Sequence, residues 1–212
     1  MVASFQECDT DMLLRQAGQG DRPTREALLD RHRSRLRQMV AFRLDRRLAA
    51  RVDPSDVVQD ALFEAAGKLS EYLRGRPIPF YPWLRQLAWD RMIELHRQHI
   101  GAKKRSVICE AGNALPLNDE SAFELADRLQ AHGGSPISQL LQKELRGRVQ
   151  AILGRLAPRD REVLILRHLE QLSTREMAAV LGISEGAVKT RHLRALQRFR
   201  QLFDEEQKEE QS

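Results

Sequence analysis

One short basic segment carries side chains suited to reading DNA bases. Residues 181–199 read LGISEGAVKTRHLRALQRF. At about 100° per residue, one helical face collects polar donors, namely Thr190, Arg191, Arg194, Gln197 and Arg198. The opposite face collects Val188, Ala195, Phe199 and Leu202. Arginine can bond guanine bidentately, so the pattern predicts a helix that enters the major groove, with Lys189 at its side near phosphate. The alternative is an ordinary solvated basic helix.

Local signals before this segment predict how it is held. Residues 173–176, STRE, fit a capping box, in which the Ser173 and Glu176 side chains each accept the other residue's backbone N–H. Gly182 can adopt the left-handed conformation that ends a helix, and Ser184 can cap the next one. Two short helices around a glycine-containing turn make a helix-turn-helix.

A second candidate surface is acidic. Asp53-Pro54 supplies an N-cap followed by proline at the first helical position. The outer face of the helix that follows carries Asp56, Gln59, Asp60, Phe63, Glu64 and Gly67. An aromatic ring among carboxylates favours a contact with a basic protein partner. The pattern equally allows Phe63 to tuck under the segment Gly75–Phe80.

The helix that starts at Phe80 has the opposite character. Arg85, Trp89 and His96 share its predicted outer face, and Lys103-Lys104-Arg105 follow. Basic groups beside an aromatic ring are what single-stranded DNA binding uses, although Trp89 could instead pack against the first helix. His96 and His99 are helical neighbours without a third ligand, so we expect no metal site.

Helical periodicity and charge blocks define the organisation of the 212 residues. No convincing strand pattern appears, which predicts an all-α protein. Net charge is +7 over residues 22–51, −4 over 106–135 and +4 over 183–203. We therefore predict two small helical modules joined by a flexible acidic linker, the second module being the helix-turn-helix. The boundaries expected are 10–105, 106–135 and 136–204.

Several classes of protein are not expected. Cys8 and Cys109 fit no ligand or redox spacing, and no apolar run approaches a membrane span. The N-terminus lacks the regions of a signal peptide, so a cytoplasmic protein is expected. No group of residues with catalytic spacing is visible in the sequence. We therefore expect that the protein is not an enzyme and binds no cofactor.

The combined motifs resemble a bacterial extracytoplasmic-function (ECF) sigma factor, over about residues 10–203. LAPRDREVLILRHLEQLSTREMAAVLGISEGAVKTRHLRAL is similar to the family's fourth conserved region. DPSDVVQDALFEAAGKL and FYPWLRQLAWDRMIELHRQ resemble two parts of its second region. The family often has Asn where Asp90 lies, and a smaller aliphatic residue where Trp89 lies.

The resemblance implies roles for these residues. Asp56, Gln59, Asp60 and Phe63 would face core RNA polymerase. The non-template strand of the −10 element would be held by Arg85, Trp89, Asp90, Lys103, Lys104 and Arg105. The −35 duplex would be contacted by Arg175, on the flanking backbone, and by Ser184, Lys189, Thr190, Arg191, Arg194 and Arg198.

The resulting hypothesis is a promoter-specificity subunit that binds core polymerase, directs it to two-part promoters and promotes DNA melting. The resemblance also implies an anti-sigma factor as a partner. The main alternative is a polymerase-independent helix-turn-helix regulator, which would usually carry an effector or receiver domain. A protein-interaction module that has lost DNA binding is disfavoured by the intact arginine face, and a nucleic-acid enzyme by the absence of clustered carboxylates.

Overall fold

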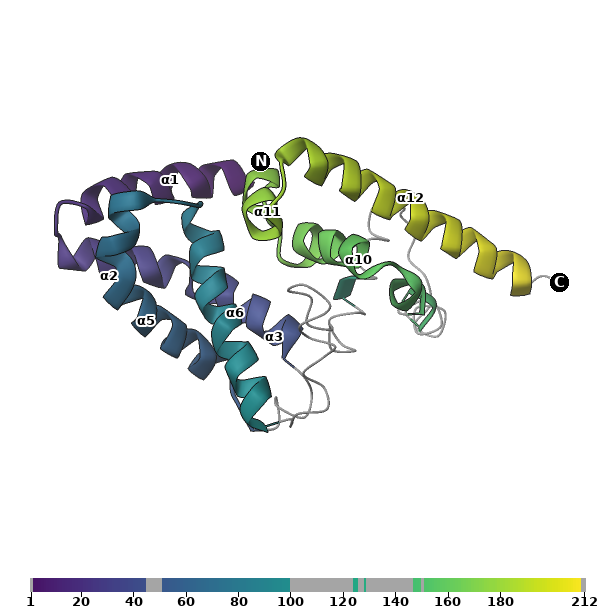
Figure 1. Ribbon diagram of the computed structural model, residues 1–212, viewed down its shortest axis with the longest axis horizontal. Coiled ribbons are helices and arrows are strands. Elements are labelled where there is room, and N and C mark those ends of the chain that lie inside the picture. The colour runs from purple at the N-terminus through teal and green to yellow at the C-terminus, as the bar shows by residue number, and fades with distance from the viewer. Residues whose placement is uncertain are drawn as a thin grey trace.

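Helices and the turns between them make up the described chain. The computed structural model describes residues 2–44, 51–99, 124, 125, 128, 147–149 and 151–210. The elements in these ranges are α1 (Val2–Ala17), α2 (Arg22–Arg31), α3 (Arg33–Arg43), α5 (Pro54–Gly75), α6 (Phe80–His99), α10 (Pro158–Leu164), the π-helix η2 (Ile165–Leu169), α11 (Thr174–Leu181) and α12 (Glu185–Glu210). No strand occurs among the described residues, which confirms the all-α prediction (Figure 1).

Capping residues set the starts of α2 and α5. Asp21 accepts a hydrogen bond from the Thr24 N–H at 3.1 Å and so caps α2. Asp53 accepts from the Ser55 N–H at 2.7 Å, and Pro54 begins α5 as predicted. Helix α5 ends at Gly75, after which Arg76 adopts the left-handed conformation with φ 40°. The local sequence therefore fixes both ends of the longest helix in this half of the chain.

The sequence carries an apolar stripe at helical spacing from Leu28 to Leu44, and the structure divides it between two helices. Helix α2 stops at Arg31 and α3 starts at Arg33, with His32 between them at φ −95° and ψ −4°. The His32 side chain is buried, and its ring lies 5.4 Å from that of Phe80. The break allows the chain to bend around the start of α6.

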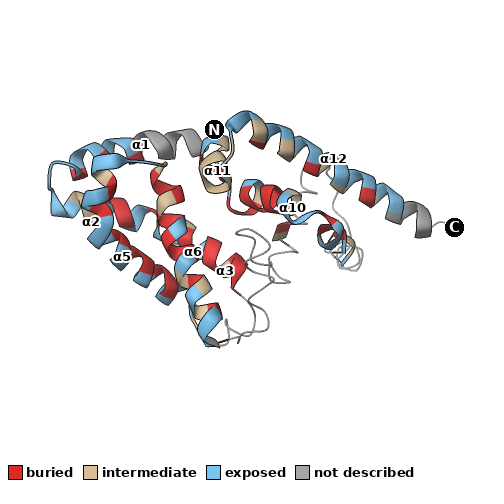
Figure 2. Cartoon of the chain, in the orientation of Figure 1, coloured by how far each residue is buried: buried red, intermediate tan, exposed pale blue. Residues whose placement is uncertain are grey.

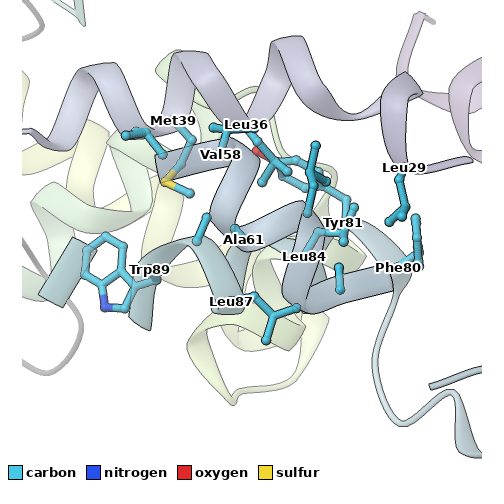
Figure 3. Packing of buried hydrophobic residues seen from close by; sticks show 14 of the residues in the cluster. Leu29, Leu36, Met39, Val58, Ala61, Phe80, Tyr81, Leu84, Leu87 and Trp89 are labelled. Carbon is cyan, nitrogen blue, oxygen red and sulfur yellow. The ribbon is translucent and has the colours of Figure 1, made fainter. Parts of the chain in front are cut away.

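The first core forms where α3, α5 and α6 pack together. Leu36 and Met39 of α3, Val58 and Ala61 of α5 and Leu84 of α6 all lie in it with almost no exposed surface (Figure 3). Burial of aliphatic side chains at this spacing is what holds amphipathic helices together, at roughly 1.5–3 kcal/mol for each large side chain.

The second half of the described chain is a compact helical module. Its core includes Ile152, Leu164 and Leu169, with Ala195 and Leu202 contributed by α12. Between α10 and α11 lies η2, where the Glu170 N–H donates to the Ile165 carbonyl at 3.1 Å. Such a wide turn accommodates one residue more than an α-helical turn does.

The two modules are packed against each other. Val163, Leu166, Leu172, Met177 and Val188 of the second module join the same buried cluster as the core of the first. Figure 1 shows α11 beside the first module, with α12 extending away from it. Of the predicted linker, residues 106–135, only Glu124, Leu125 and Arg128 lie within the described residues. Its predicted flexibility and the module boundaries stay predictions.

No helix in the described ranges is both long enough and apolar enough to cross a membrane.

The protein should become less stable as the pH is lowered, because His32 is buried in its neutral form. Burial, with Arg35 and Arg31 adding to it, lowers the pKa of His32 to about 4. The unfolded chain takes up this proton near pH 6.5, so the stabilisation is full above about pH 6.5 and is lost as pH falls to about 4. We expect a loss of about 3 kcal/mol across this window. Urea unfolding at pH 7 and pH 5 should show about 2 kcal/mol of this loss. His32→Gln should remove that part of the pH dependence, and an unchanged dependence would contradict the assignment.

Candidate protein- and nucleic-acid-binding surfaces

A helix-turn-helix positions the predicted DNA-reading residues. The Ser173 hydroxyl accepts from the Glu176 N–H at 3.2 Å, and the Glu176 carboxylate accepts from the Ser173 N–H at 2.8 Å. Gly182 has φ 65°, and the Ser184 hydroxyl accepts from the Ala187 N–H at 3.2 Å. The capping box, the left-handed turn and the second cap were all predicted from sequence, and the structure contains each of them.

The faces of α12 separate as the helical periodicity predicts. Val188, Ala195 and Leu202 are buried, and Phe199 is half-buried against the second core. The predicted DNA-contacting residues Ser184, Lys189, Thr190, Arg194 and Arg198 are exposed, and Arg191 is half-exposed. Figure 2 shows this long exposed surface along α12. The helix thus presents a row of cationic and hydroxyl donors to solvent.

Leu193 is a surface residue that the sequence analysis missed. Its side chain is 57% exposed, although leucine is usually buried. Counting at 100° per residue places it about 160° from buried Ala195, near the middle of the exposed face. An apolar side chain in that place suits the methyl group of thymine. Its place on the helical wheel, among polar residues and far from Val188 and Ala195, is the sequence signal for this exposure.

Arg175 lies on the first turn of α11 and is exposed. It lines a cleft of about 720 Å³ that also receives Arg76 and Tyr72 of the first module. Arg175 belongs to the same helix-turn-helix as the exposed face of α12. It lines the cleft between the modules, however, rather than that exposed face.

The acidic face of α5 is open to solvent. Asp56, Gln59 and Asp60 are exposed, and Phe63 is 84% exposed. Asp60 forms an ion pair with Arg91 at 2.8 Å, which orients the carboxylate without burying it. The exposure of Phe63 excludes the alternative in which this ring tucks under Gly75–Phe80. An exposed phenylalanine among carboxylates is a feature of protein-binding surfaces.

The predicted outer face of α6 is buried, which corrects the sequence analysis. Arg85 and Trp89 are each 3% exposed and His96 is 6% exposed. The second module covers this face, because the Arg85 Nε donates to Glu170 Oε2 at 2.7 Å. The Trp89 ring lies 5.1 Å from the Arg85 guanidinium carbon. In this arrangement neither side chain can reach DNA. Of the two positions that the sequence left open for Trp89, the buried one is observed, with the ring 5.5 Å from the guanidinium carbon of Arg43 on α3.

Of the other residues predicted to bind single-stranded DNA, one lies within the described residues and three lie outside them. Asp90 is exposed together with Gln86 and Arg97, about 100° around α6 from the buried Arg85 face. Partial burial, and then the neighbouring Glu64, raise the pKa of Asp90. Lys103, Lys104 and Arg105 lie outside the described residues. Among the described residues no cluster of potential metal ligands occurs.

Buried ion pairs join the modules. Arg43 donates to both oxygens of Glu162 at 2.8 Å and to Glu170 Oε1 at 2.9 Å. All four partners, including Arg85, have side chains no more than 6% exposed. The arginines lower the pKa of Glu170 to about 2 against the effect of its burial, and the carboxylates raise that of Arg43. We refer to Arg43, Arg85, Glu162 and Glu170 as the interface cluster.

The sequence is similar to those of known proteins. The family described as Sigma-70, region 4 matches residues 146–199. The RNA polymerase sigma factor CnrH of Cupriavidus metallidurans is 33% identical over 72% of this chain and 74% of its own length. The RNA polymerase sigma-E factor of Streptomyces avermitilis is 32% identical over 80% and 82%, respectively.

Two further similarities cover almost the whole chain. The ECF RNA polymerase sigma factor SigD of Mycobacterium tuberculosis is 27% identical over 90% of this chain and 82% of its own. The solved structure of CnrH in complex with the cytosolic domain of CnrY aligns with a TM-score of 0.51 and 26% identity. That alignment covers 91% of this chain and 96% of CnrH.

The turn of the helix-turn-helix can be tested with a matched pair of glycines. Gly182→Ala should lower stability by about 1 kcal/mol, because a Cβ strains the left-handed conformation although it meets no atom within 4 Å. Gly186→Ala has equally open space but lies in α12, so it should leave stability unchanged or raise it by up to about 1 kcal/mol. Thermal unfolding of both variants measures the difference, and equal effects would refute this explanation.

Proposed function

The chain belongs to the ECF family of RNA polymerase sigma factors, and from this premise we propose how its surfaces act in transcription initiation. The observation that carries the proposal is the exposure of Phe63 among Asp56, Gln59 and Asp60, on a chain that also presents a DNA-reading helix. A polymerase-independent regulator has no need of this second surface. Core RNA polymerase is the partner proposed for it, through a basic surface complementary to the α5 carboxylates.

The −35 element is the proposed ligand of α12. Arg194 and Arg198 would bond guanine edges, Leu193 would contact a thymine methyl, and Lys189 would contact phosphate. Thr190 already donates its hydroxyl to the Gly186 carbonyl at 3.1 Å, so it would meet DNA through its methyl group or its oxygen lone pairs. The helix thus combines base readout with backbone contacts.

The −10 element is the proposed ligand of α6 and the basic residues after it. The exposed side carries Gln86, Asp90 and Arg97. Lys103, Lys104 and Arg105 would add positive charge for the displaced strand. Arg85 and Trp89 would join this surface only after the second module moves away from them.

Binding energy alone would drive these steps, so we assign the protein no covalent chemistry and no cofactor. Because its proposed partners are RNA polymerase and the chromosome, we place it in the cytoplasm, without membrane insertion. CnrH has been solved with the cytosolic domain of CnrY. By analogy we propose that a protein inhibitor, an anti-sigma factor, holds this chain until it is needed.

The α5 surface is tested by combining Asp56→Lys with Phe63→Ala. Both side chains are exposed, so the fold should persist while affinity for core polymerase falls by at least about 100-fold, as expected for two residues central to an interface. The matched control combines Glu26→Lys with Met12→Ala, which reverses an exposed charge on α2 and truncates a 60% exposed side chain on α1. Native gel shift with purified core enzyme measures both. Normal binding by a folded Asp56/Phe63 variant would rule out this surface.

The α12 surface is tested with Arg194→Ala. If Arg194 bonds a base bidentately, the variant should lose about 1–3 kcal/mol on the preferred −35 sequence and little on scrambled DNA. Lys189→Ala is the comparison, since loss of a phosphate contact weakens binding uniformly across sequences. Promoter binding by the holoenzyme on both DNAs measures the two patterns. Uniform loss with Arg194→Ala would reassign this residue to phosphate.

A further inference from the structure

We infer that the cleft between the modules is a binding site for a free nucleoside monophosphate, a small anion that joins a phosphate to a planar base. The cleft has a volume of about 720 Å³ and lies where α1, α3 and the start of α6 meet the start of α11. Pockets that hold small molecules usually measure about 300–1,000 Å³. The site does not depend on the polymerase and DNA partners proposed above.

The charge of the cleft favours an anion. Four arginines line it against two carboxylates, Asp11 and Glu176, which leaves a net charge of +2 when His32 is neutral. Arg35 is already paired with Glu176 at 2.8 Å. The other three arginines are exposed at the rim, namely Arg31, Arg76 and Arg175. A phosphate monoester carries about −1.5 to −2 charges at pH 7, which matches the excess.

Both modules contribute to this rim. Arg76 follows α5, and its guanidinium donates to the Leu14 carbonyl at 3.1 Å, which directs the side chain toward α1. Arg175 extends from the first turn of α11 and forms no ion pair with any other described residue. A phosphate between the two would accept charge-assisted hydrogen bonds from both guanidinium groups.

Two unusual backbone positions also lie at the cleft. Within the described ranges, the non-glycine residues with positive φ are Arg76 at 40° and Gln171 at 53°, and both line the cleft. The left-handed conformation is unfavourable for such residues, and strain of this kind gathers at binding sites. The Gln171 carbonyl accepts from Arg35 at 3.3 Å, so a contact across the cleft holds this wall in place.

Two polar groups in the wall of the cleft have no hydrogen-bond partner among the described residues. They are the Nε2 atom of His32 and the hydroxyl of Tyr81, and both are buried. Burial lowers the pKa of His32 to about 4, so the imidazole is neutral at pH 7. Unpaired buried polar groups are rare in native proteins and mark the place of a water or a ligand. A bound nucleotide, directly or through a water that it orders, would supply these partners.

Aromatic and apolar side chains offer a surface for the base. Tyr72, Phe80 and the segment Pro77–Pro79 line the same cleft. The Tyr72 ring is stacked on Trp83 with 4.5 Å between centroids, and its hydroxyl donates to the Ile78 carbonyl at 2.9 Å, so this wall is held in one position. A fixed apolar wall beside a cationic rim should bind a planar ring joined to a phosphate better than phosphate alone.

The origin of the walls favours a free nucleotide over a nucleotide within a DNA strand. Gln171 and Arg175 belong to the second module, so the complete site exists only while the modules touch. Arg85 and Trp89, by contrast, are covered in this arrangement and would reach a strand only once the modules separate. The free nucleotide would be bound without reaction, and would stabilise the contact that builds its site.

Isothermal titration calorimetry on the full-length chain tests the site. The probes are the four ribonucleoside 5′-monophosphates, with inorganic phosphate and adenosine as separate halves of one of them. At least one monophosphate should bind with a dissociation constant of about 10–100 μM, at least about tenfold more tightly than inorganic phosphate or adenosine. Equal binding of inorganic phosphate would overturn the assignment to a nucleotide. Absence of binding by every monophosphate up to about 1 mM would overturn the site.

Two variants locate the bound phosphate. Arg76→Gly removes a rim guanidinium and places at φ 40° the residue that best tolerates this conformation. Arg175→Ala removes the guanidinium from the second module. Each should weaken nucleotide binding at least about tenfold, because a charge-assisted hydrogen bond is lost. The matched controls, Arg74→Ala and Arg159→Ala, remove exposed arginines of α5 and α10 that do not line the cleft, and should bind as the wild type does. Equal losses in variants and controls would reduce the binding to unspecific charge attraction and overturn the site.

A single-stranded oligonucleotide is the remaining probe. Its binding with a loss on Arg175→Ala, while no free monophosphate binds, would make the ligand a strand and overturn the free nucleotide. Failure of the proposed function gives a different result, namely no promoter-specific transcripts from the wild-type chain with core polymerase. The calorimetric titration does not depend on that outcome.

Discussion

Neutralisation of four buried charges is the constraint on which the arrangement of this chain depends. Neither Arg43 nor Glu170 can be buried alone without a large desolvation cost, and their partners come from opposite halves of the sequence. Each module therefore completes the electrostatics of the other. The shared apolar cluster, which includes Leu36 of α3 and Val188 of α12, joins the two modules as well.

The same contact divides the binding surfaces by accessibility. The face of α5 with Phe63 and the face of α12 with Arg194 both point to solvent, whereas the Arg85 face of α6 does not. A partner that recognises α5 can therefore bind before the modules separate. The proposed contact of Arg85 and Trp89 with single-stranded DNA would require this covered side of α6 to be exposed.

Local features were predictable from sequence and distant ones were not. The capping box at Ser173, the left-handed Gly182 and the cap at Asp53 depend on neighbours within a few residues, so their side-chain chemistry is legible in the chain. Arg85 was assigned to an exposed face, and Trp89 was left between that face and packing against the first helix. Helical periodicity shows which residues share a face of α6, but not which other helix covers that face. Glu162 and Glu170 gave no signal, since an ion pair across more than a hundred residues leaves no local pattern.

The π-helix at Ile165–Leu169 decides where Glu170 points. In an uninterrupted α-helix, positions 162 and 170 would lie about 80° apart around the axis. A π turn absorbs one residue, which reduces this offset to about 20° and places both carboxylates on one side, toward Arg43. A wide turn of this kind has the same length as an α-helical turn with one residue inserted. Deletion of one residue from this turn would therefore rotate Glu170 away from Glu162 and from their shared partner Arg43, with α12 itself unaltered.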